Sequence, residues 1–136
     1  MKVLVDTCVW SLVLRRPAGS KDPAAKALRQ LILENRALIM GPIRQELLSG
    51  MTDRVHFERL VLVLHGFSDL SLEGSDYIKA AQFSNTCRAK GVQGSGTDFL
   101  LCAASVRHEV SILTTDKDFQ HYAKLLPIRL FNPGVM

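Results

Sequence analysis

Short apolar runs separated by helix-length stretches constrain the fold of this chain most strongly. The run Val3-Leu4-Val5 is β-rich and stops at Asp6. Comparable runs follow at 37–40, 67–70, 110–114 and 128–130. Runs of this kind are typical of strands that are buried in a parallel sheet, and strands that alternate with helices imply crossover connections. The sequence therefore predicts an α/β sandwich with a mainly parallel five-stranded sheet.

Helix signals fill the intervals between the predicted strands. Asp22 followed by Pro23 is a strong start signal, because Asp caps a helix and Pro suits its first position. Thr52 or Asp53 is expected to begin another helix. Further helices are predicted at 9–14, at 43–48, from Ser71 or Ser75 to about 89, from a Thr97 cap to about 107, and at 119–125. Glu73 and Asp76 fall at helical positions where exposure to solvent is expected.

Length and charge indicate one domain over residues 1–136 and an anionic partner. The net charge of +4 favours nucleic acid, although many basic proteins bind none. The three cysteines, Cys8, Cys87 and Cys102, have no spacing typical of a disulfide framework or a zinc site. The start is unlike a signal peptide, and no apolar run reaches the length of a membrane span. We expect a cytoplasmic protein with no membrane partner.

Several acidic residues are expected at one edge of the predicted sheet. Asp6 closes the first strand, and Asp116 follows the fourth strand by two residues. Asp98 opens the apolar helix that leads into that fourth strand, and Glu46 lies in a short helix between apolar neighbours. Ligand sites in open parallel sheets lie at the carboxyl ends of the strands. Each acid alone could be a cap or an exposed side chain, but their combined order and context favour one site.

Converging carboxylates without matching basic residues repel one another, and a hard divalent cation removes that conflict. We therefore expect Asp6, Asp98 and Asp116 to bind Mg²⁺, for which Mn²⁺ can substitute, with Glu46 completing the catalytic set. Such an ion activates water and engages phosphate, which fits a nuclease.

Four segments carry a resemblance to a known family. They are VLVDTCVW, IRQELLSG, GTDFLLCAAS and LTTDKDF, which contain Asp6, Glu46, Asp98 and Asp116 respectively. Together they resemble the motifs of PIN-domain ribonucleases, and in particular of the VapC-type toxins of toxin–antitoxin pairs. The resemblance spans nearly the whole chain. It implies a three-layer α/β/α sandwich with a central parallel sheet. It also implies a magnesium-dependent endoribonuclease that is the toxin of such a pair, an RNA substrate, a homodimer and a cognate antitoxin that blocks the site.

The resemblance also suggests supporting residues near the acids. The hydroxyls of Thr7, Thr97 and Thr115 are candidates for placing metal or phosphate. The alternative role of all three is to cap a helix, and for Thr97 the two roles are equally favoured. Asp118 could share the position of Asp116 or bind through water. Candidates for contacts with the RNA backbone are Arg15, Arg16, Arg44 and Lys117.

Partner surface is expected around the helices at 43–64 and at the apolar residues Trp10, Leu12 and Val13. For Trp10, core packing is slightly favoured over a partner contact.

Other functions fit less well. A haloacid-dehalogenase-type phosphohydrolase would require a second Asp two residues after Asp6, where Cys8 stands. No P-loop motif is present. The alternative that remains open is a PIN-like module that binds RNA without cleaving it.

Overall fold

The computed structural model describes residues 1–15 and 20–135 of the chain. Its sheet contains β1 (Val3–Val5), β2 (Ala37–Leu38) and β3 (Ser111–Leu113), in the order β2-β1-β3. Both pairings are parallel, and Leu4 lies opposite Leu38 on one side and Ile112 on the other. The predicted α/β class and the parallel sheet are confirmed.

The prediction of five strands is wrong for the described residues, because two of the runs form only isolated parallel bridges. Ile39 bridges Asp69, and Ile112 bridges Leu130. At the first bridge, the Leu70 N–H donates to the Ile39 carbonyl at 2.7 Å. At the second bridge, the Ile112 N–H donates to the Arg129 carbonyl at 2.9 Å, and the Phe131 N–H donates to the Ile112 carbonyl at 2.7 Å.

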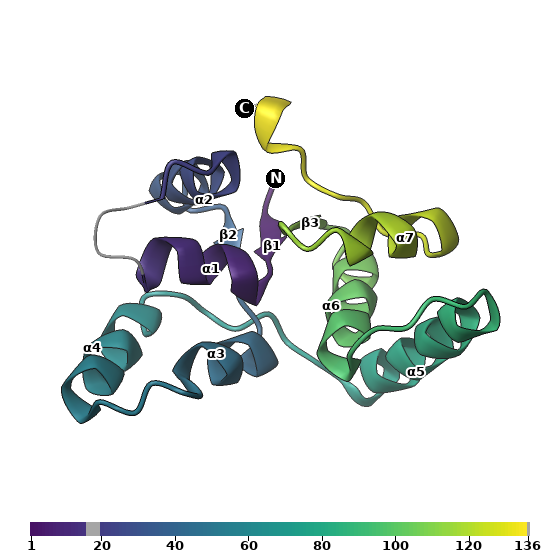
Figure 1. The fold of residues 1–136 in the computed structure, drawn as a ribbon, viewed down its shortest axis with the longest axis horizontal. Coiled ribbons are helices and arrows are strands. Elements are labelled where there is room, and N and C mark those ends of the chain that lie inside the picture. The colour runs from purple at the N-terminus through teal and green to yellow at the C-terminus, as the bar shows by residue number, and fades with distance from the viewer. Residues whose placement is uncertain (16–19, 136) are drawn as a thin grey trace.

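Helices lie on both sides of this small sheet, with α1 and α2 beside β2 and with α6 and α7 beside β3 (Figure 1). The helices are α1 (Thr7–Leu14), α2 (Pro23–Leu33), α3 (Gly41–Leu48), α4 (Arg54–Leu64), α5 (Gly74–Ala89), α6 (Gly96–Arg107) and α7 (Asp118–Leu125), and a 3-10 turn, η1 (Pro133–Val135), follows. No helix within the described ranges is long and apolar enough to cross a bilayer.

Several helix starts differ from the predictions. Asp22 and Asp53 cap α2 and α4 as expected. The cap of α6 is Ser95, not Thr97, and the Ser95 hydroxyl accepts a hydrogen bond of 3.1 Å from the N–H of Asp98. Helix α5 begins at Gly74, between the two serines that were proposed to start it.

Asp76 is buried, with 1% exposure, although it was expected to face solvent. Its carboxylate accepts hydrogen bonds from the Arg107 guanidinium at 2.8 and 2.9 Å and from the N–H of Glu73 at 2.8 Å. Arg107 also donates to the carbonyl of Ser71 at 2.7 Å. This network fixes the start of α5 to the end of α6, and thereby anchors the helix that carries Asp98.

Trp10 belongs to the core and not to a partner surface. Its side chain is fully buried, its indole N–H donates to the carbonyl of Val5 at 3.1 Å, and its ring packs edge-on against Phe67. Leu12 and Val13 are half-buried on α1. Trp10 therefore fixes α1 against β1, which sets the direction in which Asp6 leaves the sheet.

Candidate active site

Asp6 stands at the carboxyl end of β1 and is the N-cap of α1. One carboxylate oxygen accepts the N–H of Thr7 at 2.8 Å, and the other accepts the hydroxyl of Thr114 at 2.8 Å. The side chain is only 8% exposed. Burial raises the pKa of Asp6 above its ordinary value, the hydrogen bonds from Thr114 and Thr7 oppose this rise, and the charge of Asp98 adds to it.

Glu46 is brought to this edge by α3. It is exposed, and its carboxylate accepts a hydrogen bond of 2.7 Å from the hydroxyl of Thr7. Because Thr7 also donates its backbone N–H to Asp6, one residue contacts both acids. The role predicted for Thr7, placement of metal or phosphate, stays a prediction.

Asp98 lies in the first turn of α6 and is half-buried. Its carboxylate accepts a hydrogen bond of 3.0 Å from the phenol of Tyr122 on α7. Burial is the main cause that raises the pKa of Asp98, and the charge of Asp116 raises it further. The charge of Asp98 acts on Asp6 and the charge of Asp116 acts on Asp98, so Asp98 lies within electrostatic reach of both other carboxylates.

Asp116 follows β3 and is joined to Asp6 through Thr114. The Thr114 hydroxyl donates to Asp6 and accepts the N–H of Asp116 at 3.0 Å. The Asp116 carboxylate accepts the N–H of Asp118 at 2.9 Å, so Asp116 supports the first turn of α7, whereas the Asp118 side chain is exposed. Thr114, which the sequence did not single out, therefore links the two acids, and the supporting role predicted for Thr115 stays a prediction.

The four acids converge without a basic partner. Within residues 1–15 and 20–135, no Lys, Arg or His forms an ion pair with Asp6, Glu46, Asp98 or Asp116. Carboxylates without a basic partner match the oxygen ligands that Mg²⁺ and Mn²⁺ prefer. In the arrangement seen here, no three His, Cys, Asp or Glu side chains of the described residues are already positioned to hold a metal ion together. The acids point instead to Thr and Tyr hydroxyls and to backbone N–H groups.

Two of the predicted RNA-binding arginines are engaged within the protein. Arg15 donates to the carbonyls of Glu46, Leu47 and Ser49 at the end of α3. Arg44 binds Asp69 at 3.0 Å and donates to the carbonyls of Leu64 and Phe67. Both side chains therefore hold α3 and the segment after α4 in place.

Arg16 lies outside the described residues. The side chain of Lys117 is exposed next to Asp116 and has no ion-pair partner in the described part of the chain.

Tyr122 and Gly94 were missed by the sequence analysis. Tyr122 is fully buried and packs against Phe99 and Phe119, with ring centroids 5.1 and 5.0 Å apart. A Cβ atom on Gly94 would lie 2.1 Å from the Tyr122 oxygen, so only glycine allows the phenol to sit where it meets Asp98. The available signal was a tyrosine on the apolar face of a helix, which usually indicates only core packing.

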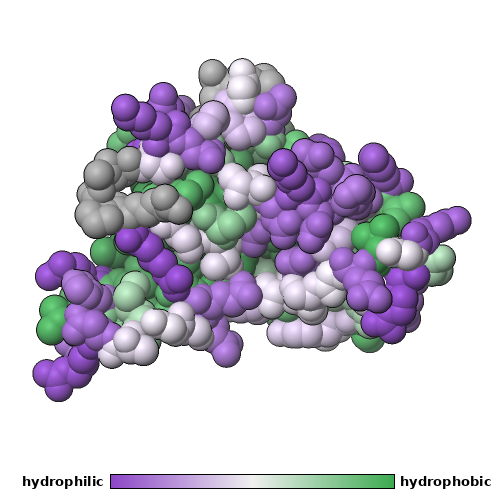
Figure 2. Space-filling model, viewed as in Figure 1, coloured by the Kyte–Doolittle hydropathy of each residue, from purple (hydrophilic) through white to green (hydrophobic). Residues whose placement is uncertain are grey.

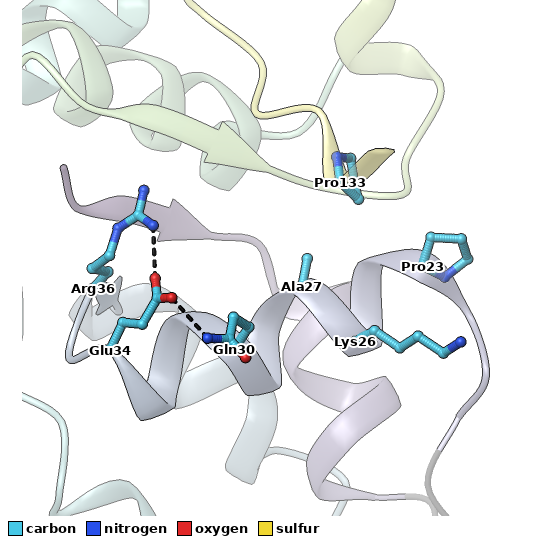
Figure 3. A pocket seen from close by; sticks show the side chains of 7 residues that line it. All are labelled: Pro23, Lys26, Ala27, Gln30, Glu34, Arg36 and Pro133. Carbon is cyan, nitrogen blue, oxygen red and sulfur yellow. Dashed lines mark hydrogen bonds and ion pairs between the residues drawn. The ribbon is translucent and has the colours of Figure 1, made fainter. Parts of the chain in front are cut away.

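Two cavities differ in their relation to the acids. One, of about 540 Å³, lies between α2 and the C-terminal segment, and Figure 3 shows it lined by an ion pair between Glu34 and Arg36. It contains none of the four acids. A second, of about 350 Å³, is lined by Thr114, Asp116 and their neighbours, and therefore opens beside the acidic centre.

Comparison with known proteins gives a consistent result. The model of the PIN domain matches residues 3–125. The VapC ribonuclease Mb1587 of Mycobacterium bovis is 32% identical over 127 residues, which cover 90% of this chain and 92% of that protein. Ribonuclease VapC11 of Mycobacterium tuberculosis has the same identity and coverage.

Solved structures agree with the fold. The structure of FitAcB from Neisseria gonorrhoeae superposes with a TM-score of 0.72 at 20% identity, covering 98% of this chain and 99% of that one. VapBC2 from Rickettsia felis, solved with a DNA fragment from its promoter, gives a TM-score of 0.73 at 12% identity, covering 97% of this chain and 98% of that one.

Proposed function

The chain belongs to the PIN domain family, and from that premise we propose that it is a metal-dependent endoribonuclease, the toxin of a toxin–antitoxin pair. One observation carries the proposal. Asp6, Glu46 and Asp116 come from separate segments and are joined at the carboxyl end of the sheet through Thr7 and Thr114, and the charge of Asp98 acts on the buried Asp6 carboxylate. A buried carboxylate beside other acids and without a counter-ion costs free energy, which favours a functional role for the group.

The oxygen donors fit Mg²⁺, with Mn²⁺ as a substitute. Asp6, Asp98 and Asp116 would hold the ion, with Glu46 beside them, once their carboxylates turn from the hydroxyl and N–H groups that they contact here. When bound, the metal supplies an activated water molecule and charge stabilisation for hydrolysis of a phosphodiester bond.

The protein itself fixes the positions of the acids. Thr7 contacts both Asp6 and Glu46, and Thr114 contacts both Asp6 and Asp116. Tyr122 orients Asp98 through its hydroxyl. Low exposure of Asp6 keeps bulk water from screening its charge. A pre-arranged set of this kind lowers the reorganisation that binding of metal and phosphate requires.

The proposed substrate and partners are inferred from the names of the related proteins. Two relatives are named ribonucleases, which supports RNA as the substrate, and the VapBC and FitAB structures support an antitoxin partner. We further propose a homodimer that acts in the cytoplasm. Helix α4 offers an apolar surface for the antitoxin, because Val55, Phe57, Leu62 and Val63 are all more than a third exposed.

An alternative is a PIN-like module that binds RNA without cleaving it. The absence of a ready-made metal cluster among the described residues is the observation that favours it. The two functions differ in whether added metal produces new RNA ends.

The test is cleavage of a mixed RNA substrate by purified protein with Mg²⁺ and with EDTA. We expect cleavage only with Mg²⁺ and a loss of at least about 100-fold in Asp6→Asn and Asp98→Asn, since each removes a charged metal ligand. Glu58→Gln is the matched control, because Glu58 is an exposed acid on α4. Wild-type rates in both Asn variants would overturn the proposal, and binding of RNA without cleavage would favour the alternative.

A further inference from the structure

The cavity beside Asp116 is formed by two segments that meet past the end of β3. Hydrogen bonds from Ile112 N–H to the Arg129 carbonyl (2.9 Å) and from Phe131 N–H to the Ile112 carbonyl (2.7 Å) hold the C-terminal segment against β3. The 114–117 turn and Gln120 of α7 supply the opposite wall. The cavity is therefore built by backbone pairing and does not depend on the placement of a single side chain.

The cavity shares residues with the acidic centre. Thr114 and Asp116 line it, and Thr114 also contacts Asp6. A ligand that occupies the cavity would consequently have one end at the carboxylates proposed to act on a phosphodiester bond. The volume of about 350 Å³ lies near the small end of ligand sites, which span roughly 300–1,000 Å³, and suits one nucleotide.

The lining has the chemistry that a nucleotide requires. Phe131 is a half-buried aromatic ring, and bases stack on such rings. Gln120 and Asn132 carry amides that can pair with base edges. The side-chain amide of Gln120 forms no hydrogen bond among the described residues. The side-chain oxygen of Asn132 accepts the Gly134 N–H at 3.0 Å, which leaves the side-chain NH₂ group of Asn132 to donate. Lys117 supplies an exposed cation.

The surface around the cavity is polar as well. Figure 2 shows hydrophilic residues gathered over the connection between β3 and α7 and over α7 itself. Lys117, Gln120 and Lys124 are spaced three and four residues apart, are all exposed, and share one face of α7 and its start. A strand of RNA that leaves the cavity along this face would meet two cations.

We propose that this cavity holds the RNA nucleotide next to the scissile phosphate, with Phe131 stacking on the base, Gln120 and Asn132 contacting its edge, and Lys117 contacting a backbone phosphate. The inference rests on the proposed ribonuclease function. It gives the enzyme a base preference at one position beside the cleaved bond, in addition to contacts with the backbone that do not depend on sequence.

The first experiment needs no catalysis. Isotope-labelled full-length protein in EDTA is titrated with the four 5′-nucleoside monophosphates and, separately, with inorganic phosphate, while backbone amide shifts are recorded. We expect shifts at Thr115, Lys117, Gln120 and Asn132, with one base binding best. Shifts confined to other regions, or equal effects from inorganic phosphate, would overturn the proposal.

The second experiment measures cleavage. The ends produced from a randomised RNA pool are sequenced for the wild type, Gln120→Ala, Phe131→Leu and Lys117→Ala. Leucine keeps the apolar bulk of Phe131 but removes the stacking surface, and we expect KM for RNA to rise by about fivefold or more. Gln120→Ala should relax the base preference. Lys117→Ala should reduce the magnitude of the slope of log binding constant against log salt concentration by about one.

Matched controls are Gln82→Ala and Lys90→Ala, which change the same residue types at exposed positions on or next to α5. They should retain the wild-type preference and KM. If the wild type cleaves RNA and the three cavity variants behave as these controls do, the nucleotide site is wrong and the nuclease function stands. If nucleotides bind in the cavity but no RNA is cleaved, the nuclease function is wrong and the nucleotide site stands.

Discussion

The phenol of Tyr122 connects the Asp98 carboxylate to the buried side of α7. The hydrogen bond is 3.0 Å long, and aromatic contacts with Phe99 and Phe119 keep the ring in one position. Hydrogen-bond partners of metal ligands typically contribute 10- to 100-fold in metal affinity. Tyr122 is therefore a positioning residue for Asp98, although the sequence alone presents it as a core aromatic.

Removing only the hydroxyl tests this role. We expect Tyr122→Phe to fold normally, because the ring packing remains, and to bind Mn²⁺ about tenfold more weakly in calorimetry. Gly94→Ala should act in the same direction, because its new Cβ would displace the phenol. Tyr77→Phe is the control, since Tyr77 is 55% exposed on α5. Wild-type Mn²⁺ affinity in Tyr122→Phe would contradict the positioning role.

Asp6 gives a prediction about stability. Its raised pKa means that the folded protein binds the proton more tightly than the unfolded chain, so folding is favoured below the unfolded pKa and loses this contribution as pH rises through the folded pKa. Asp6→Asn removes the charge and should raise the Tm of the metal-free protein by a few degrees at about pH 7.

The gain in Asp6→Asn should shrink as pH falls below about 4, because the wild-type carboxyl is then neutral too. Thermal unfolding in EDTA across pH 3–8 measures it. A variant that is less stable than the wild type at pH 7 would show that the hydrogen bonds from Thr7 and Thr114 outweigh burial.

At the scale of elements, the α5–α6 pair depends on one ion pair that the sequence does not reveal. Asp76 is buried against Arg107, whose hydrogen bonds hold the pKa of Asp76 below its ordinary value. Asp76→Asn leaves Arg107 with only the more distant Glu73 carboxylate, 3.7 Å away, and should cost about 3 kcal/mol in urea unfolding at pH 7. Because the folded pKa is depressed, the contribution is present above the unfolded pKa and lost as pH falls through the folded pKa.

The exposed pair Arg54–Glu58 provides the contrast. Its partners are 88% and 67% exposed, so Glu58→Gln should change the unfolding free energy by less than about 0.5 kcal/mol. An equal loss in both variants would mean that burial does not strengthen the Asp76 interaction.

The elements also show what sequence reasoning can and cannot supply. The strands around β1 and β3 and the caps Asp22 and Asp53 follow from local patterns, and they were predicted correctly. The bridges at Asp69 and Leu130 are shorter than the predicted strands, because the length of a strand depends on how far the segment runs alongside its neighbour in the folded chain, which a local sequence pattern does not specify.

The residues of the candidate site likewise fall into those that the sequence could place and those that it could not. Asp6, Asp98 and Asp116 could be placed at one edge because parallel strands align their ends. Thr114 and Tyr122 could not, because their roles arise from contacts across 108 and 24 residues. Hydrogen bonds of this range depend on how the layers pack, and no local pattern in the sequence encodes them.

At the scale of the whole molecule, the chain is matched nearly end to end by its relatives, and its acidic centre has no counter-charge within the described residues. Crowded acids destabilise the folded state when no cation is bound. A ligand that binds only the folded state stabilises that state by RT ln(1 + [L]/Kd), which is about 2.7 kcal/mol when the ligand concentration is 100 times Kd. Metal binding should therefore couple directly to global stability.

We accordingly expect saturating Mg²⁺ or Mn²⁺ to raise the Tm of the wild type by an amount on the order of 10 °C relative to EDTA. Asp98→Asn and Asp116→Asn should respond much less, because each removes a ligand, whereas Glu58→Gln should respond as the wild type does. Scanning calorimetry at constant ionic strength separates this effect from general screening by salt. A wild type that gains no stability from either ion would argue for the RNA-binding module, since a nuclease of the proposed kind must hold its metal in the folded state.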